Sequence, residues 1–454
     1  MNESLAWATT NFESVQLFDC RRSRRLINIA SRLAENKGVS LARLFDGWYD
    51  TKATYNLLKL NVMTPNIIQS NHRQLAYENI MNWSGDVLAI DDSSEFEWNG
   101  NQPIDGLGPI GSGRKADQGF ILHSTLAVGI GDKNQSFKIL GLPFQQYYVR
   151  PPKGKQKKRR SKTSDPMETS LWQEVIKQKA IPASQRVIRV CDRAADIYEV
   201  MTETKKYGCK HIIRLKHDRK VIEPINKNVK LLMQELPSMG NTSIQKRGRD
   251  GCKKRTITLQ VNWQEVSVRA PERPGFNIGE LPSLQELVVH VWGIDPETDE
   301  LIEWYLYTDL PINSLEDALK TVQYYATRWM IEDYHKAIKS GMRAENLQLE
   351  TAHALFAAVA IMSVVALRLL DVREALRSNP DAPANQSGLD EFELKVLGAY
   401  LKRDLMTVRC VALAIGRLGG HQNRRSDGMP GLLTLWIGLS RLINIVEGAR
   451  LSVN

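Results

Sequence analysis

The chain has 454 residues, of which 42% are hydrophobic and 25% charged, a composition typical of a globular protein with two or three domains. Its formal charge of +10 favours a polyanionic partner, and its five scattered cysteines indicate neither a disulfide framework nor a zinc site, which favours a reducing compartment. No signal peptide is predicted, and the apolar stretch from Ala354 to Leu367 is shorter than a membrane span, so we expect a buried helix there and no membrane association.

Residues 1–80 are predicted to form a helical N-terminal domain. Leu26, Ile29 and Leu33 recur at helical spacing, and the amphipathic helix that they predict begins with a basic cluster of Arg21, Arg22, Arg24 and Arg25. Such a cluster is either a solvated helix end or a contact for DNA phosphates, and the residues alone do not separate the two. Thr64 followed by Pro65 predicts the start of a later helix.

Acidic residues come directly after each of two predicted buried strands. Val87 to Ile90 predicts a short strand, after which come Asp91 and Asp92. Val187 to Cys191 predicts another strand, and Asp192 begins a helix at its end. Each acid is ordinarily a turn former or a helix cap, and the alternative is a metal ligand at a strand terminus.

Strand-like segments surround these acids. Phe120–Val128 and Ser136–Leu142 are consistent with an antiparallel meander beside the first strand. His211–Leu215 predicts a further strand, which places Arg214 and Lys216 near these acids. Residues 153–162 form a basic loop that is either solvated or bound to DNA phosphates.

Residues 220–300 are rich in β-type runs separated by turn residues, which predicts a β-rich insertion before the next helix. Ile302–Thr308, containing Trp304, is the expected strand leading out of it. After residue 345 the chain is predicted to be helical to its end. The last two helices have wide apolar faces, which suit either self-association or packing on the core.

The segment from Thr321 to Ser340 contains no Pro or Gly and is predicted to be one helix. Ser314 and Asp317 ahead of it match a capping box. At about 100° per residue, one narrow stripe of the helix carries four polar side chains, those of Tyr325, Arg328, Glu332 and Lys339. The stripe is either a solvated face with ion pairs or a metal ligand, Glu332, set between groups that grip phosphate.

Asp92, Asp192 and Glu332 together predict a catalytic site more strongly than any one of them alone. Mg²⁺ is held by a few carboxylates, and two such ions activate the attacking oxygen and stabilise the leaving oxygen in phosphodiester cleavage. An acid on each of two strands followed by an acid on a helix is the order of an RNase H-like fold. We therefore expect an α/β multidomain protein with an RNase H-like catalytic domain at 81–345, flanked by helical domains at 1–80 and 346–454.

The residues of the stripe fit the spacing Y-x2-R-x3-E-x6-K, and the chain resembles there the DDE transposases of the insertion-sequence-four family, which includes the transposon-five transposase. The segments VLAIDDSSEF and VIRVCDRAADIY resemble the first two acidic motifs of that family, at Asp92 and Asp192. The second motif departs from the family pattern at Ala194, where relatives often carry Glu. None of the three acids is affected by this change.

The resemblance implies that the three acids are catalytic and bind Mg²⁺, for which Mn²⁺ would substitute. It implies that Trp304 stacks on a flipped base. The other DNA contacts that it implies are Tyr325, Arg328, Lys339, Arg214, Lys216, Arg21, Arg22, Arg24 and Arg25.

The implied function is cut-and-paste transposition in the cytoplasm of a bacterium, at the nucleoid. A homodimer would pair the two ends of an insertion sequence, cleave them through a hairpin intermediate and join their 3′-hydroxyls to double-stranded target DNA. Two alternatives are an RNase H-like nuclease that cuts without joining and a non-catalytic DNA-binding regulator of transposition.

Overall fold

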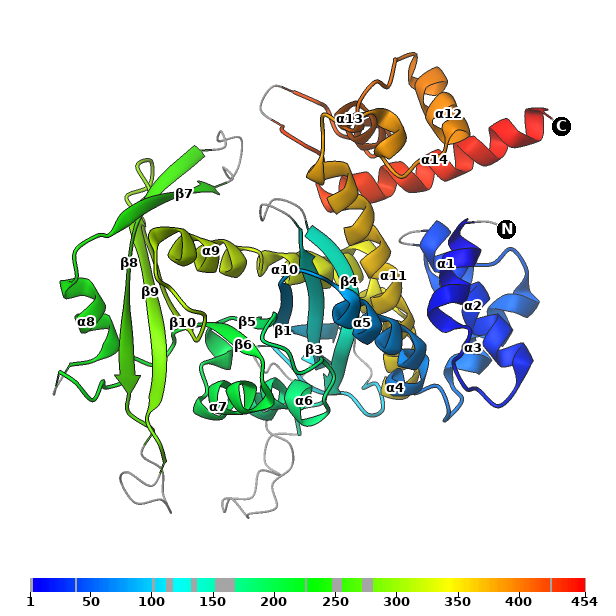
Figure 1. Cartoon of the computed structure of the whole chain (residues 1–454). Helices are drawn as coiled ribbons and strands as arrows, with labels where there is room; N and C mark the ends of the chain where they lie inside the picture. Colours follow the sequence, from blue (N-terminus) through cyan, green and yellow to red (C-terminus); the bar gives the residue numbers. More distant parts are fainter. Residues whose placement is uncertain are drawn as a thin grey trace.

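The fold is described from a computed structural model of the chain (Figure 1). It describes residues 3–36, 39–99, 103–111, 117–131, 137–151, 168–224, 227–246, 255–271, 281–424 and 427–453. The basic loop at 153–162 lies outside these residues, so its predicted contact with DNA stays a prediction.

The N-terminal part is helical, as the sequence predicts. Its helices are α1 (Glu3–Phe12), α2 (Cys20–Glu35), α3 (Trp48–Leu58), α4 (Pro65–Ile68) and α5 (Ser70–Asn82). Asp19 caps α2 by accepting a hydrogen bond from the Arg21 amide, and Leu26, Ile29 and Leu33 are buried. Thr64 caps α4 with Pro65 at its first position, which confirms the predicted start of that helix. These helices pack on one another and on the long α11 (Ala352–Ser378) (Figure 1).

One mixed sheet runs through the centre of the molecule. The antiparallel strands β4, β3 and β1 are followed by β5 and β6, which run parallel to β1, and then by antiparallel β10, β9, β8 and β7. Their bounds are β1 Val87–Asn99, β2 Gly108–Pro109, β3 Asp117–Ile130, β4 Phe137–Tyr148, β5 Val187–Cys191, β6 Lys210–Arg214, β7 Gly240–Lys246, β8 Arg255–Val268, β9 Leu284–Ile294 and β10 Leu301–Thr308. The chain is thus a mixed α/β protein.

The β-rich segment predicted at residues 220–300 continues this same sheet instead of forming a separate one, because β10 pairs with both β6 and β9. Within it, the residues on both sides of Asn262 belong to one strand, β8. Asn262 is tolerated inside it because its buried amide donates to the carbonyls of Met233 and Leu236 at the end of α8 (Val229–Glu235). A buried polar residue whose amide has hydrogen-bond acceptors therefore does not end the strand.

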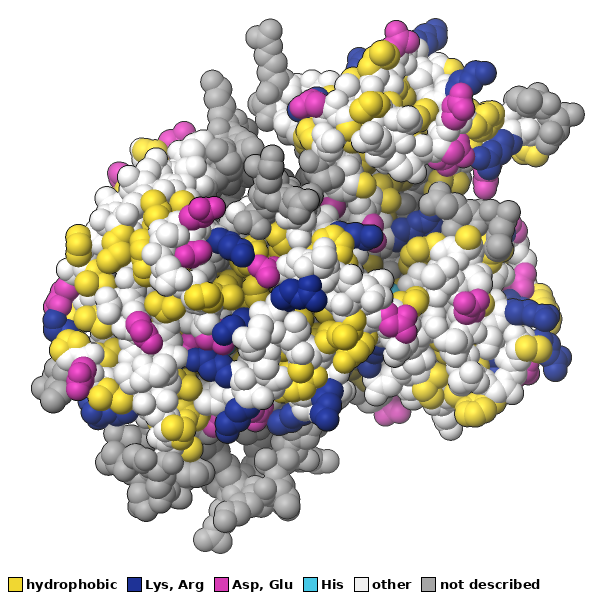
Figure 2. Space-filling model, viewed as in Figure 1, with side chains coloured by type: hydrophobic (Ala, Val, Ile, Leu, Met, Phe, Trp, Pro, Cys, Tyr) yellow, Lys and Arg dark blue, Asp and Glu magenta, His cyan; other side chains and the backbone are white. Residues whose placement is uncertain are grey.

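Helices cover the two faces of the central strands. Leu88 and Ile90 belong to the core formed with α10 (Trp329–Lys336) and α11, whereas Val87 and Ala89 face the core formed with α6 (Leu171–Lys177). Successive side chains of β1 therefore enter two different cores. The C-terminal helices α12 (Glu391–Leu401), α13 (Val408–Leu418) and α14 (Leu432–Val453) form a third core and stand out from the body of the molecule (Figures 1 and 2).

Two helices, α11 and α14, are long and apolar enough to cross a membrane by length and composition alone. The apolar stretch of α11 extends further than the sequence suggested, over Ala352–Leu376, but 78% of its most apolar window is buried inside the protein. It packs on β4, α2 and α3, as the core helix of a folded domain does. The prediction of a buried helix at Ala354–Leu367 is confirmed.

His72 joins three elements in its neutral form. Its Nδ1 lies 2.7 Å from Asn11 Oδ1 on α1, and its Nε2 accepts the Leu142 amide of β4 at 3.0 Å. Burial, and secondarily the charge of Arg73, lowers the pKa of His72 to about 4. A proton on Nε2 would face that amide N–H, so protonation breaks the contact.

The stability of the fold is expected to fall as the pH drops through this range. The folded-state pKa lies below the unfolded value of 6.5, so the contribution of His72 is complete above pH 6.5 and is lost towards pH 4. The free energy of unfolding should lose about 3 kcal/mol from this group. Urea unfolding at a series of pH values checks this, with His72→Asn as the comparison. An equally steep fall in the variant would contradict the assignment.

Candidate active site

Asp92 lies in the middle of β1, and not at the end of a strand as the sequence predicted. β1 extends to Asn99 because its antiparallel pairing with β3 holds it along its whole length. The parallel pairing with β5 ends at the pair Asp91–Cys191. β1 thus loses its second neighbour just where Asp92 begins, and the Asp92 side chain lines a pocket there.

Asp91 points to the other face of the sheet and is a structural residue. Its Oδ2 accepts hydrogen bonds from Nε and Nη2 of Arg189 at 2.8 and 2.6 Å. Its Oδ1 accepts one from Thr125 at 2.5 Å. Asp91 and Arg189 are almost completely buried, at 0% and 1% exposure. Adjacent acids in the sequence therefore have different roles, because strand side chains alternate between faces.

Asp192 is the first residue after β5. Its Oδ1 accepts the Ala194 amide at 2.8 Å and so caps a single 3₁₀ turn, Arg193–Ala195. The helix predicted to begin at Asp192 begins only at Tyr198, as α7 (Tyr198–Tyr207). Because β1 and β5 are parallel neighbours, Asp92 and Asp192 are brought to the same place in the sheet.

The prediction of one continuous helix over Thr321–Ser340 is wrong. The structure has α9 (Leu315–Ala326), α10, and a π-helical turn at Ala337–Gly341. Between α9 and α10 the amides of Arg328 and Met330 bond to carbonyls three residues back, which tightens the chain locally. The capping box of Ser314 and Asp317 at the start of α9 is confirmed.

The broken helix still brings its polar residues to the acids. A pocket of about 490 Å³ is lined by Asp92, Asp192, Glu332, Arg328 and Lys339, together with Ser93, Ser94, His335, Lys336, Ser340 and Glu345. Arg328 lies between two of the acids, with Nη1 at 3.3 Å from Asp92 Oδ2 and Nη2 bonded to Glu332 Oε1. The guanidinium partly neutralises both carboxylates.

Asp92 is harder to ionise than an ordinary aspartate, mainly because it is buried. Burial raises the pKa of Asp92 to about 7, and the charges of Asp192 and Glu332 raise it while that of Arg328 lowers it. Within the described residues no three His, Cys, Asp or Glu side chains are gathered closely enough to hold a metal ion as they stand. The donor set itself fits a hard divalent cation, since it consists of carboxylate oxygens whose mutual repulsion a cation would relieve.

Tyr325, Arg214 and Trp304 form a neighbouring group rather than part of this pocket. Tyr325 is buried, and burial raises its pKa while Arg328 and Arg214 hydrogen-bond to it and lower it. Arg214, on β6, also donates to the Glu303 carbonyl at 3.1 Å. The Trp304 ring meets that of Tyr325 edge-on, with centroids 5.7 Å apart.

Lys339 is held at the rim of the pocket by its own chain. Its ammonium donates to the Glu95 carbonyl at 2.6 Å and lies 3.3 Å from Glu345. It also lies over the ring of Phe96. A phosphate that reached Lys339 would have to compete with these partners.

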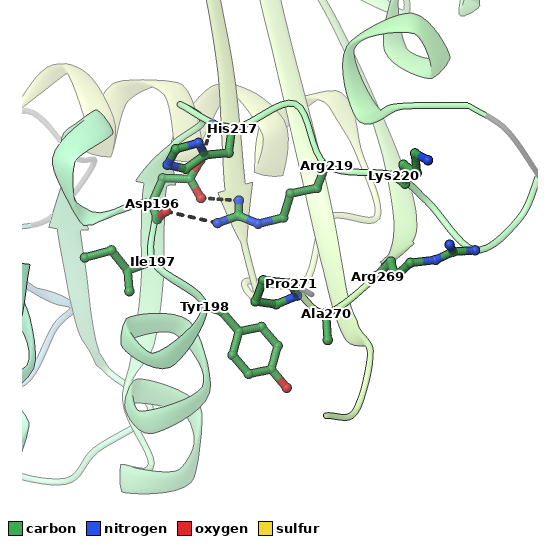
Figure 3. Close-up of a pocket in the computed structure, with 9 residues that line it drawn as sticks. All are labelled: Asp196, Ile197, Tyr198, His217, Arg219, Lys220, Arg269, Ala270 and Pro271. Carbon is green, nitrogen blue, oxygen red and sulfur yellow. Dashed lines mark hydrogen bonds and ion pairs between the residues drawn. The ribbon is translucent and has the colours of Figure 1, made fainter. Parts of the chain in front are cut away.

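Lys216 does not line the acid pocket, and the next residue, His217, lines a second pocket of about 540 Å³ (Figure 3). Asp196 fixes the chain there, since its carboxylate accepts the Lys216 and His217 amides at 2.6 and 2.7 Å and pairs with Arg219. Figure 3 shows Arg219 directed at Asp196 across the pocket. The Lys216 side chain is exposed and lines neither pocket.

The basic cluster of α2, formed by Arg21, Arg22, Arg24 and Arg25, is not part of the acid pocket either. Arg21 and Arg24 are exposed, and Arg25 pairs with Asp50 of α3 at 2.6 Å. Arg22 donates to the Leu17 carbonyl at 3.3 Å. The cluster thus combines two exposed arginines, of which Arg21 pairs with Asp19 at 3.6 Å, with arginines that hold α2 in place.

The sequence predictions missed three charged or titratable residues of the pocket, His335, Lys336 and Glu345. His335 and Lys336 follow Glu332 by three and four residues, so helical spacing carries a signal for them. Burial lowers the pKa of His335 to about 3, and its Nε2 lies 3.3 Å from Ser124 Oγ. Glu345 follows a left-handed residue, Arg343, and no sequence pattern indicates its position.

Comparison with known proteins matches two stretches of the chain. Residues 4–61 match a family described as transposase DNA-binding, and residues 169–368 match the transposase DDE domain. Asp192 and Glu332 lie inside the second match, and Asp92 lies between the two. A cryo-EM structure of a piggyBac transposase synaptic complex with hairpin DNA aligns with 99% of this chain and 73% of that chain, at 11% identity and a TM-score of 0.38, a likeness too low to bear on function. On the two domain matches, the chain carries a transposase DNA-binding domain and a transposase DDE domain.

Proposed function

We propose that this protein is a cut-and-paste DNA transposase of the insertion-sequence-four type. The observation that carries the proposal is the one pocket that Asp92, Asp192 and Glu332 all line, although they come from two strands and a helix far apart in the sequence. The pocket lies in a chain that also has a transposase DNA-binding domain. DNA is therefore the substrate that both parts of the chain would share.

In this proposal the strands β4, β3, β1, β5 and β6 form an RNase H-like core within a catalytic domain at 81–345. Residues 1–80 bind the ends of the element, and residues 346–454 form a helical domain that joins two copies into a homodimer. The strand order supports the first point, because it places the antiparallel meander beside two parallel strands. The protein would act at the bacterial nucleoid, in the cytoplasm.

Asp92, Asp192 and Glu332 are the residues that would hold Mg²⁺, or Mn²⁺ in its place. Bound there, such ions lower the pKa of a water and stabilise the charge on the leaving oxygen. The carboxylates then no longer need Arg328, whose guanidinium becomes available to a DNA phosphate. Tyr325, Lys339 and Arg214 would orient the same strand, and Lys216 would contact it further away.

The DNA would react in four steps. Water would first hydrolyse one strand at the element's end and free its 3′-hydroxyl. That hydroxyl would attack the opposite strand, which gives a hairpin and releases the flanking DNA. A second water would open the hairpin, and the 3′-hydroxyl would then attack a phosphodiester of the target DNA, from which a target 3′-hydroxyl leaves. Trp304 would stack on the base that the hairpin extrudes, an interaction worth about 1–3 kcal/mol. Because the Trp304 ring contacts Tyr325 in this structure, stacking on a base would require the Trp304 side chain to turn outward.

Incubating the purified protein with end-bearing duplex and Mg²⁺ tests the proposal. A transposase yields nicks, hairpins and joined target products. Nicks without joined products would indicate an RNase H-like nuclease, and binding without any cut would indicate a non-catalytic regulator. Either result would overturn the proposed function.

The proposed phosphate contacts can be tested through the salt dependence of DNA binding. Arg328→Ala or Lys339→Ala should weaken end binding and reduce the slope of log K against log salt by about 1 each, since each contact releases about one counterion. Binding measured over a series of salt concentrations gives the slope. Lys395→Ala, at an exposed position of α12, is the matched control and should leave it unchanged. Unaltered slopes in both pocket variants would exclude phosphate contact there.

A further inference from the structure

The most exposed aromatic side chains of the described residues all belong to the N-terminal domain. Phe18 is 86% exposed, and Trp48 and Tyr49 are each 78% exposed. Large aromatic rings are rarely exposed to water to this extent. A single apolar residue on a surface needs no explanation, but a group of them does. Two adjacent rings, at the start of one helix, therefore call for a partner.

These rings lie next to the basic cluster of α2. The ion pair between Arg25 and Asp50 ties α2 to the first turn of α3, directly after Trp48 and Tyr49. Arg21 forms an ion pair with Asp19 at 3.6 Å but keeps 87% of its side chain exposed, and Arg24 is exposed on the same helix. Basic and hydrophobic side chains lie beside one another over these helices at the outer edge of the molecule (Figure 2).

The segment just before α2 also exposes an aromatic ring, that of Phe18. Phe18 has a φ of +59°, a backbone conformation that bulky residues rarely adopt. It directly precedes Asp19, the cap of the basic helix α2. Exposed aromatic rings and arginines thus lie at the starts of two helices that an ion pair joins, and the carboxylates of Asp19 and Asp50 lie among them.

Such a surface is complementary to duplex DNA. Arginines bind phosphates and fix the position of a protein on the duplex, but they carry no sequence information. Aromatic side chains pack against or between bases, and the energy that is needed to unstack and bend a base step depends on the sequence of that step. The match of residues 4–61 to a transposase DNA-binding domain puts both kinds of group in the part of the chain that meets DNA.

We propose that Trp48 and Tyr49 contact the bases of the element's end and set which end sequence is bound, while Arg21 and Arg24 hold the adjacent phosphates. This deepens the proposed function and rests on it, since it assumes that the N-terminal domain binds ends. The two rings determine specificity, and the arginines determine affinity.

The test begins by selecting duplexes from a pool that is randomised over about two helical turns, using the full-length protein. The enriched duplex and a scrambled duplex then serve as probes for the double variant Trp48→Ala/Tyr49→Ala. We expect the preference for the enriched duplex to fall at least about tenfold. Binding of the scrambled duplex and the salt slope should not change, because no charge is lost. Arg21→Ala/Arg24→Ala should instead weaken both duplexes and reduce the slope.

Three controls keep the result interpretable. Trp48→Phe/Tyr49→Phe should retain most of the preference, and equal thermal midpoints show that the variants fold. Tyr400→Ala, an exposed ring on α12, should leave the preference unchanged. An unchanged preference in the double alanine variant, in a protein that cleaves the enriched duplex, would overturn this inference alone.

Two other outcomes are separable. If the original protein enriches no sequence and cuts no DNA, then the proposed function fails as well. If the double variant keeps its preference but sediments at a lower mass without DNA, then the rings bind a second copy of the chain and not DNA, and the inference is wrong.

Discussion

Asp192→Asn is expected to abolish DNA cleavage and to leave end binding intact. The variant keeps the size of the side chain, and its amide oxygen still accepts the Ala194 amide that Asp192 accepts now. It removes one of the three negative charges that would hold a divalent cation in the proposed site. A loss of about 4 kcal/mol in transition-state stabilisation lowers the rate about 10³-fold.

Cleavage and binding must be measured on the same end duplex in Mg²⁺ to separate these effects. Glu316→Gln, an exposed carboxylate on the first turn of α9, is the matched control and should cut at the original rate. If Asp192→Asn nicks DNA at the original rate, then Asp192 does not take part in the chemistry. If it loses binding as well, then its role is in holding DNA.

Asp91→Asn is expected to damage the fold, although Asp91 adjoins a proposed catalytic residue. The change leaves the guanidinium of Arg189 buried without its counter-charge, and Arg189 is only 1% exposed. Breaking such a pair by removing one partner costs about 3–5 kcal/mol. The free energy of unfolding from urea titration should fall by that amount.

Asp92→Asn is the control for this second prediction. Burial already disfavours the charge of Asp92, so the amide should not lower the free energy of unfolding. It should nevertheless stop cleavage. Equal losses of stability in Asp91→Asn and Asp92→Asn would contradict the assignment of the two side chains to opposite faces of β1.

Features that depend on a few neighbouring residues could be read from the sequence. The caps at Thr64 and Ser314 need only a side-chain oxygen and amides within one turn. The buried core positions of α2 follow from helical spacing alone. These are local interactions, and local sequence is sufficient for them.

The extent of β1 and the break at Arg328 could not be read in the same way. Ser93, Ser94 and Glu95 form a polar run that resembles a loop, but pairing with the distant β3 keeps them extended. The break between α9 and α10 has no Pro or Gly to signal it. Both features are imposed by contacts between segments far apart in the chain.

The acids of the site could be predicted together, whereas their partners could not. Asp92, Asp192 and Glu332 line one pocket, as expected of a shared site. The bridge that Arg328 makes between Asp92 and Glu332 depends on the geometry of the broken helix. Lys216 was expected beside the acids because it follows β6, but Asp196 holds its backbone at another pocket.

Counting bound Mn²⁺ by electron paramagnetic resonance, in the complex with end DNA, tests the central claim most directly. The account predicts that the original protein binds Mn²⁺ in this complex, and that Asp92→Asn, Asp192→Asn and Glu332→Gln each bind it much more weakly. Equal Mn²⁺ binding by the original protein and all three variants would show that these carboxylates do not hold the metal.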